Sequence, residues 1–271
     1  MNYRKQLGFA AIGAFAAAAL NASADHHSDW VDLFNGKDID AWTVKFTGYD
    51  VGVNARNTFR VEDGILKVRY DEYETFDNHF GHIFYKEPFS YYKLEVEYRF
   101  VGEQVAEGHD WAYRNNGILF HAQAPETMTR DQAFPDSIEY QILGGDGDNE
   151  RSTGNLCTPG SSVIMDGVFR PEHCIESGGP TLHGDQWATA KIIVHGSERI
   201  QHFVNGEKVM EYTHPMLTED GSLMGGGYIS LQAESHPTDI RAVRILNLEG
   251  CMNPESDNYK DHFVRHNAES C

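Results

Sequence analysis

The stretch AKIIVHGSERIQHFVNGEKVMEY, residues 190–212, decides the fold class of this chain. A period-two pattern of apolar and polar side chains runs through residues 190–194 and again through residues 199–204, around a turn at Gly196-Ser197. Asn205-Gly206 then marks a hairpin turn, because these residues readily adopt the positive φ angles that a two-residue hairpin needs. Such a pattern is typical of strands with one buried face. The stretch therefore predicts an antiparallel meander of at least three strands.

The same pattern continues on both sides of this meander. Residues 93–100, KLEVEYRF, alternate charged with apolar side chains. Asp63-Gly64 marks another hairpin, and residues 228–232 and 240–246 give two late strands, while helical periodicity is scarce. Many short strands with regular turns favour a sandwich or a barrel. Because about 220 residues are too many for an immunoglobulin-like unit, we predict an all-β, concanavalin A-like lectin/glucanase jelly-roll β-sandwich.

The N-terminus has the pattern of a secretory signal peptide, which we predict to span residues 1–24. Arg4 and Lys5 precede an apolar, Ala-rich run over residues 7–20, and small residues follow at positions 22–24. The run is shorter than the roughly 20 residues that a membrane-spanning helix needs, and no other stretch of the sequence is apolar for as long. We therefore expect no transmembrane segment and an exported protein, whether periplasmic, on the outer surface or secreted.

The chain is acidic, with a formal net charge of −19 at pH 7, and residues 1–24 contribute only basic charges to it. An acidic surface disfavours nucleic acids and anionic lipids as partners. It suits a neutral small-molecule or oligosaccharide ligand, although it does not identify that ligand.

The four cysteines of an exported chain favour disulfides, since extracytoplasmic compartments are oxidising. They permit three connectivities, and the sequence does not choose among them by itself. Local pairing of Cys157 with Cys174 and of Cys251 with Cys271 is favoured, because the second pair brackets a tail with few apolar residues. We predict a jelly-roll domain over residues 25–250 and a short, disulfide-bracketed appendage over residues 251–271.

Six sequence motifs resemble, in the same order, those of the 3-keto-disaccharide hydrolase domain family. They are WVDLFNGKDIDAW at residues 30–42, RNNGI at 114–118, IEYQIL at 138–143, TGNLCTPG at 153–160, HFVNG at 202–206 and ISLQAESHP at 229–237. One departure is Asn116, where the family more often has Ser. The resemblance implies a jelly roll that cleaves glycosides whose C3 hydroxyl has been oxidised to a ketone, with a sugar 3-oxidoreductase acting upstream. The tail after residue 250 resembles short segments of bacterial surface proteins.

A 3-keto group makes the C2 hydrogen acidic, so the glycosidic bond can break by elimination, with water added afterwards. This route needs a base, an acid for the leaving oxygen and donors for the enolate oxygen. Strand alternation puts Glu139 and Gln141 on one face of residues 138–143. Gln141 stands where an ordinary glycosidase would use a second carboxylate, which disfavours that mechanism. We predict Glu139 as the base and His121 or His236 as the acid; the alternative for Glu139 is a solvated position on an outward strand face.

The remaining candidates are residues that would bind the substrate. Polar side chains would donate or accept hydrogen bonds, and an aromatic ring would stack on a sugar, although surface or core positions are the plain alternatives. We predict this role for Trp111, Arg114, Asn116, Gln141, His202, Gln232 and Glu234.

Fourteen histidines raise the question of a metal, but no HExxH string or comparable ligand pattern occurs. The oxygen-rich segment GGDGDNE, residues 144–150, is a candidate calcium site without EF-hand spacing, and a solvated turn is the alternative. We therefore predict no obligatory cofactor. Two other functions stay open, a non-catalytic carbohydrate-binding lectin-like module and an ordinary glycosidase, because the fold does not fix the function.

Overall fold

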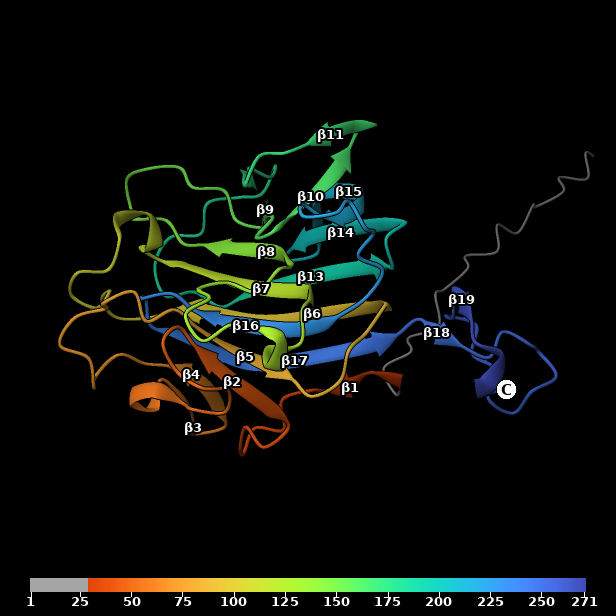
Figure 1. The fold of residues 1–271 in the computed structure, drawn as a ribbon, viewed down its shortest axis with the longest axis horizontal. Coiled ribbons are helices and arrows are strands. Elements are labelled where there is room, and N and C mark those ends of the chain that lie inside the picture. Colours follow the sequence, from red (N-terminus) through yellow and green to blue (C-terminus); the bar gives the residue numbers. More distant parts are fainter. Residues whose placement is uncertain (1–28) are drawn as a thin grey trace, which may run out of the picture.

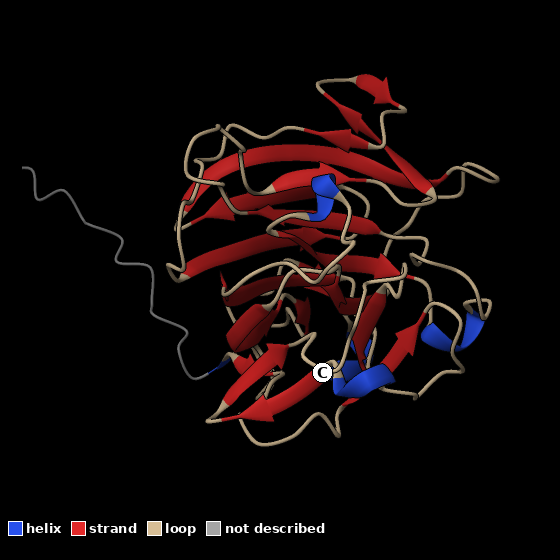
Figure 2. Cartoon of the chain, turned by 90° about the vertical axis from the view of Figure 1, so that its left-hand side faces the viewer, coloured by secondary structure: helices blue, strands red, loops and turns tan. Residues whose placement is uncertain are grey.

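The computed structural model describes residues 29–271. The predicted signal peptide at residues 1–24 lies outside the described residues. The chain forms two antiparallel sheets stacked face to face, connected by loops and single turns of 3-10 helix (Figures 1 and 2). This β-sandwich confirms the predicted all-β jelly-roll fold. Within residues 29–271, no helix has the length and apolar character needed to cross a membrane.

The larger sheet has ten strands. Nine of them follow the order β11-β10-β15-β14-β13-β6-β17-β4-β3, and the tenth, β1, pairs with β17. Its strands are β1 (Val31–Asp32), β3 (Phe59–Glu62), β4 (Ile65–Val68), β6 (Tyr91–Phe100), β10 (Ser161–Met165), β11 (Val168–Arg170), β13 (Ala188–His195), β14 (Arg199–Val204), β15 (Glu207–Leu217) and β17 (Thr238–Asn247).

The smaller sheet has seven strands, in the order β12-β9-β8-β7-β16-β5-β2. Its strands are β2 (Trp42–Phe46), β5 (Gly81–Tyr85), β7 (Asn115–Ala122), β8 (Ile138–Leu143), β9 (Asn155–Cys157), β12 (Cys174–Ile175) and β16 (Tyr228–Ala233). The single-turn 3-10 helices in the connections are η2 (Ala55–Asn57), η3 (Asp110–Ala112), η4 (Pro125–Thr127) and η5 (Ala268–Ser270).

The meander predicted from residues 190–212 is present as β13, β14 and β15. Val204 pairs with Glu207 across the Asn205-Gly206 turn, and both turn residues have positive φ angles. β13 then pairs with β6, whose buried and half-buried residues alternate strictly along its length. The apolar half of each strand fills the space between the sheets, and each large apolar side chain buried there stabilises the fold by about 1.5–3 kcal/mol.

Both predicted disulfides are present. Cys157 and Cys174 are directly opposite each other in the β9–β12 pair, and Cys251 and Cys271 close the C-terminal appendage. The appendage lies at one end of the sandwich and contains a two-stranded parallel pair, β18 (Glu249–Gly250) and β19 (Arg265–His266) (Figure 1). It is held there by the contact of the Phe263 ring with Gly250 and by an ion pair between Lys260 and Asp29.

Candidate functional site

A cleft of about 650 Å³ opens on the outer face of the seven-stranded sheet. In β8 the inward residues Ile138, Tyr140 and Ile142 belong to the core, so the alternate residues Glu139 and Gln141 face outward. The volume lies within the range of roughly 300–1,000 Å³ typical of small-molecule sites. The lining includes Asp110, Trp111, Asn115, Phe134, Glu139, Gln141, Arg151, Pro159, His173, Glu234 and the Cys157–Cys174 disulfide.

Glu139 is a buried carboxyl group, which excludes the alternative of a solvated surface residue. It pairs in register with Leu119 on β7 and Cys157 on β9, and it is only 5% exposed. Burial raises the pKa of Glu139 to about 8, because the ionised form is poorly solvated there. Its carboxyl group lies over Gly117, where a Cβ atom would be 2.6 Å from Oε1. The absence of a side chain at position 117 therefore leaves room for the carboxyl.

Glu234 brings a second carboxyl group to the same cleft. It follows the end of β16 and is 3% exposed, and its Oε2 has no hydrogen-bond partner within residues 29–271. Burial, and then the negative charge of Glu139, raise the pKa of Glu234 well above its usual range. Because ionising one carboxyl opposes ionising the other, the pair loses its two protons in separate steps.

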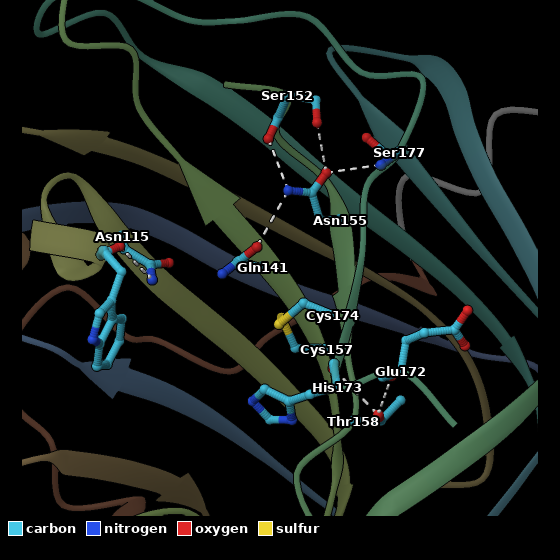
Figure 3. Close-up of a disulfide and its surroundings, with 11 residues drawn as sticks. Asn115, Gln141, Ser152, Asn155, Cys157, Thr158, Glu172, His173, Cys174 and Ser177 are labelled. Atoms are coloured by element: carbon cyan, nitrogen blue, oxygen red, sulfur yellow. Dashed lines mark hydrogen bonds between the residues drawn. A yellow bond between two sulfur atoms is a disulfide. The ribbon is translucent and has the colours of Figure 1, made fainter. Parts of the chain in front are cut away.

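Gln141 is held in one orientation by a chain of hydrogen bonds (Figure 3). Its side-chain oxygen accepts from Asn155 Nδ2 at 3.2 Å. Asn155 is itself fixed, since its Oδ1 accepts from Ser152 Oγ at 2.9 Å and from the Ser177 backbone at 2.8 Å. With its oxygen engaged, Gln141 presents its amide nitrogen, a hydrogen-bond donor, to the cleft that it lines.

Trp111 gives the cleft a half-exposed aromatic wall. It lies in η3 and is 51% exposed, and it stacks on His109 with ring centroids 5.1 Å apart and on Phe80 at 6.1 Å. Its carbonyl accepts hydrogen bonds from Asn115 and from Arg151. The indole is therefore supported from behind and offers a flat face, as expected of a ring that stacks on a sugar.

The opposite wall contains the Cys157–Cys174 disulfide and His173 (Figure 3). The disulfide ties β12 to the edge of β9, and the Thr158 backbone donates to the His173 carbonyl at 2.8 Å. Thr158 Oγ1 also donates to the carbonyls of Glu172 and His173. The covalent link therefore fixes an irregular segment as part of the cleft.

Four predicted substrate-binding residues lie outside the cleft lining: Gln232, which is fully buried on β16, and three residues with structural contacts. His202 is between the sheets, hydrogen-bonded through Nδ1 to the Gly154 carbonyl and through Nε2 to the Tyr212 hydroxyl. Asn116 faces inward, since its neighbours on β7 face outward, and it donates to Thr238 at 3.1 Å. Arg114 holds a loop by bonding the Gly184 carbonyl and Asp185. All three have structural contacts that account for their burial.

The two histidines predicted as acids also lie outside the cleft. His121 borders a separate hollow and has its Nε2 3.1 Å from the Gly196 carbonyl. His236 packs edge-on against the rings of Phe100 and Tyr113. Burial lowers the pKa of both to about 4, so both are uncharged near neutral pH and are weak candidates for a proton donor.

The predicted calcium segment, residues 144–150, forms a turn that uses its own carboxylate. Asp146 accepts from the backbones of Asp148 and Asn149 and from the Asn149 side chain, and these bonds lower the pKa of Asp146. Throughout residues 29–271 no cluster of three or more His, Cys, Asp or Glu side chains has an arrangement suited to a metal. The arrangement corresponds to the alternative of a solvated turn.

Five polar or aromatic cleft residues were not predicted from the sequence: Asp110, Asn115, Phe134, Arg151 and His173. Asn115 had a signal, because alternation from Gly117, the register partner of Gln141, places it on the same face. The others lie outside the strands of the seven-stranded sheet, where periodicity gives no information about direction.

A two-sheet β-sandwich with carboxyl groups, an amide and a half-exposed tryptophan in one cleft defines a protein of the carbohydrate-active class. The sequence profile of the 3-keto-alpha-glucoside-1,2-lyase-like domain matches residues 29–246. The chain therefore belongs to that family, as its motifs predicted. A search of curated proteins by sequence found no match.

Solved structures with a similar fold differ strongly in sequence. A protein of unknown function with a galectin-like fold from Bacillus subtilis shares 14% identity, covering 77% of this chain and 90% of its own, with a TM-score of 0.51. A structure from work on endo-acting O-glycanases of the human gut microbiota shares 17% identity, covering 80% and 98%, with a TM-score of 0.50. LamA from Zobellia galactanivorans, bound to laminaritriose and laminaritetraose, shares 14% identity, covering 80% and 96%, with a TM-score of 0.49. At such low sequence identities, these structures are similar to this chain in fold alone.

Proposed function

We propose that this protein cleaves 3-keto-glycosides, with Glu139 as the base and Glu234 as the acid. The observation that carries the proposal is the pair of buried carboxyl groups in one cleft, each with a raised pKa. Buried carboxyl groups with raised pKa values are typical of acid–base sites, because they exchange protons near neutral pH. Membership in the 3-keto-alpha-glucoside-1,2-lyase-like family supports the same reaction.

The proposed reaction begins with the pair holding one proton, on Glu234. The Glu139 carboxylate removes the hydrogen at C2, and the electrons of that C–H bond form an enolate with the C3 ketone. The enolate then expels the glycosidic oxygen from C1, which leaves a C1=C2 double bond and takes the Glu234 proton. Water adds to C1 and returns a proton to Glu234, while Glu139 returns its proton to C2. The net result is hydrolysis, and both carboxyl groups regain their starting states.

Two neighbouring side chains fit this route. The amide nitrogen of Gln141 is a donor fixed from behind by Asn155, so it suits an oxygen that gains negative charge. The half-exposed face of Trp111 suits the apolar face of a sugar ring at the cleft wall. Donors that are fixed before the reaction stabilise a developing charge without reorganising.

The Glu139–Glu234 pair also favours a second candidate, an ordinary glycosidase. Gln141 stands in place of one carboxylate of that mechanism, but Glu234 supplies a carboxyl group to the same cleft from a different strand end. Two carboxyl groups in one site are what glycoside hydrolysis requires. A non-catalytic lectin-like module is the third candidate, supported by the stacking surface at Trp111.

A paired-substrate experiment separates the three candidates. Purified protein would be incubated with trehalose and with 3-keto-trehalose, and the products followed by mass spectrometry. We expect cleavage of the oxidised sugar alone. Cleavage of trehalose would instead establish an ordinary glycosidase, and binding of either sugar without any product would establish a lectin-like module.

We further propose that the protein acts after export, on substrates that an upstream sugar 3-oxidoreductase has oxidised. The two disulfides are consistent with an oxidising compartment. Intact-mass analysis of protein secreted by the native host would test export. A mature chain beginning after residue 24 is expected, and a mass that retains residues 1–24 would contradict the proposal.

A further inference from the structure

A second hollow, of about 270 Å³, lies at the end of β7 and shares no lining residue with the Glu139 cleft. Its lining comes from the end of β7, from the residues just before β8, and from the end of β15 with the connection to β16. We term it the β7 hollow. Its chemistry comes from two ionisable side chains, His121 and Asp136, and three apolar ones, Leu217, Leu223 and Met224.

A β-bulge directs the His121 side chain toward this hollow. Between two of the residue pairs that join β7 to β16, β7 contains one residue more than β16, and His121 lies there with a φ angle of +49°. Strict alternation from Leu119, the register partner of Glu139, would place His121 on the outer face of the sheet. Instead its Nε2 lies 3.1 Å from the Gly196 carbonyl, in the turn between β13 and β14 of the other sheet. Bulges that re-aim a side chain, and non-glycine residues with positive φ, are typical of functional sites.

The His121 ring has one proton, and its position is fixed. A carbonyl oxygen only accepts hydrogen bonds, so the Nε2 atom that faces Gly196 carries the proton. Burial lowers the pKa of His121 to about 4, so the ring is neutral near pH 7 and its Nδ1 is an acceptor. Nδ1 is buried and has no hydrogen-bond partner within residues 29–271. Because buried polar atoms are nearly always paired, this acceptor indicates a site for a ligand that donates.

Asp136 adds a second acceptor to the β7 hollow. Burial and the negative charge of Glu219 raise the pKa of Asp136, and no hydrogen bond within residues 29–271 offsets them. A cation in the hollow would favour the ionised form of this carboxyl group. The Gln123 amide also lines the hollow, but its oxygen and its nitrogen are already hydrogen-bonded. The two open polar groups therefore both accept, in a region of negative charge.

We propose that the β7 hollow binds a primary ammonium group on an unbranched alkyl chain, the chemistry that a lysine side chain shares with free alkylamines. An ammonium has three donors and no acceptor, so it can donate to His121 and Asp136 together. The alkyl chain would pack against Leu217, Met224 and the half-exposed Leu223. The site is independent of the proposed function, because the hollow is separate from the Glu139 cleft.

Other ligands match the hollow less well. An alcohol has a single donor for two acceptors and no charge to balance Asp136 and Glu219. Two ionisable side chains are fewer than the three or four protein ligands of a typical zinc site. An organic anion would meet the negative charge of the hollow and of the whole chain, which is −19 at pH 7.

The first test follows the Nδ1 resonance of His121 by NMR in the full-length protein labelled with ¹⁵N-histidine. The resonance would be assigned by its absence in His121→Asn, since asparagine tolerates a positive φ angle. We expect n-butylammonium chloride to shift it in a saturable manner. Tetramethylammonium chloride, a cation without N–H donors, should leave it in place, and n-butanol should bind at least about tenfold more weakly. An unmoved resonance with n-butylammonium, or an equal shift with tetramethylammonium, would overturn the proposal.

The second test measures the affinity for n-butylammonium in variants, using the same resonance. Asp136→Asn removes the charge and keeps the shape, so the affinity should fall about tenfold. Leu223→Ala shortens a half-exposed side chain and should lower it about threefold. Glu207→Gln, in the hairpin between β14 and β15, removes the same charge outside the hollow and should not change it. Affinity like that of the wild type in a folded Asp136→Asn, with melting as the check, would contradict an ammonium site.

A third titration distinguishes the two sources of the ammonium group. Nα-acetyl-lysine N-methylamide carries the lysine side chain on a short piece of backbone. If it binds at least as tightly as n-butylammonium, a lysine of a polypeptide is the ligand. If it binds about tenfold more weakly, because its backbone does not fit at the rim, a free alkylamine is the ligand.

Discussion

The outer faces of the two sheets carry buried carboxyl groups in opposite circumstances. On the ten-stranded sheet, Asp239 is bonded by Arg99 at 2.8 and 2.9 Å and by Arg69. On the seven-stranded sheet, Glu139 and Glu234 lie in the cleft, where burial raises the pKa of both. The same strand alternation places all three residues outward or at a strand end. The difference between these carboxyl groups lies in the side chains that bond them, which are arginines at Asp239.

This contrast separates a structural use of charge from a chemical one. A buried carboxylate with guanidinium partners stays ionised and ties neighbouring strands together. Without such partners, a buried carboxyl group holds its proton up to higher pH and becomes able to exchange it near neutrality. A substitution on the outer face of one sheet can therefore be compared with a similar substitution on the outer face of the other.

The largest expected effect comes from Glu139→Gln, which keeps the shape and removes the base. Turnover of 3-keto-trehalose should fall by about 10²–10⁴-fold, the usual contribution of a general base. Glu95→Gln on the other sheet removes a carboxylate bonded by Arg244 and Lys191, and it should leave the rate unchanged. Steady-state kinetics and thermal melting of both variants make the comparison. Rates like those of the wild type in Glu139→Gln would remove this residue from the mechanism.

Asp239→Asn should have the opposite effects, a lower stability and an unchanged turnover. Loss of the charge leaves Arg69 and Arg99 without their shared carboxylate and should lower the free energy of unfolding by about 2 kcal/mol. The loss should be smaller than for a fully buried pair because both arginines are partly exposed. Urea denaturation measures the change, and kcat/KM should stay as in the wild type. A fall in kcat/KM at full stability would show that the two faces are coupled.

Two tryptophans extend the same contrast to aromatic side chains. Trp111 is half-exposed at the cleft, whereas the guanidinium groups of Arg99 and Arg241 lie over the ring of Trp187, 4.6 and 4.4 Å from its centroid. Trp111→Ala should weaken sugar binding about tenfold, measured by calorimetry, since a stacked ring contributes about 1 kcal/mol beyond its buried area. Trp187→Ala should leave sugar affinity unchanged and lower the melting temperature. Equal losses of affinity would count against a stacking role for Trp111.

The last expected effect is gradual, because it is spread over several pH units: the pH dependence of stability. Burial raises the pKa of Glu139 from 4.5 to about 8, so between these pH values the folded chain keeps a proton that the unfolded chain has lost. The free energy of unfolding should therefore fall as the pH rises through this window, by up to about 1.4 kcal/mol per pH unit. Denaturant titrations across the window should show a flatter slope in Glu139→Gln. An unchanged slope would mean that this carboxyl group does not titrate as described.

Much of the fold was readable from the sequence because strands with one buried face repeat with a period of two. The alternation in β6 and the Asn205-Gly206 hairpin predicted the meander, and residue spacing favoured both disulfides. The outward position of Glu139 followed from the same rule. Its burial did not, because residues outside the strands, such as Phe134 and Trp111, line the same cleft, and periodicity gives no information about their direction.

The predicted roles of the histidines illustrate the limit of strand alternation as a guide to position. Alternation tells which face of a strand a residue occupies, but not whether the face is inside the sandwich or which loop covers it. His202 therefore occupies the core although it belongs to a predicted strand, and His121 borders a different hollow. Glu234 was predicted to bind the substrate, and only the folded arrangement places its carboxyl group within electrostatic reach of Glu139.

Gly117 has a consequence for how relatives of this protein can be recognised. Even an alanine there would place a methyl group where the Glu139 carboxyl group now lies. We expect that a relative with any larger residue at this position has had to redirect its glutamate, and with it the direction from which the sugar is attacked. We expect a glycine at this position in the relatives that keep the proposed catalytic arrangement of Glu139.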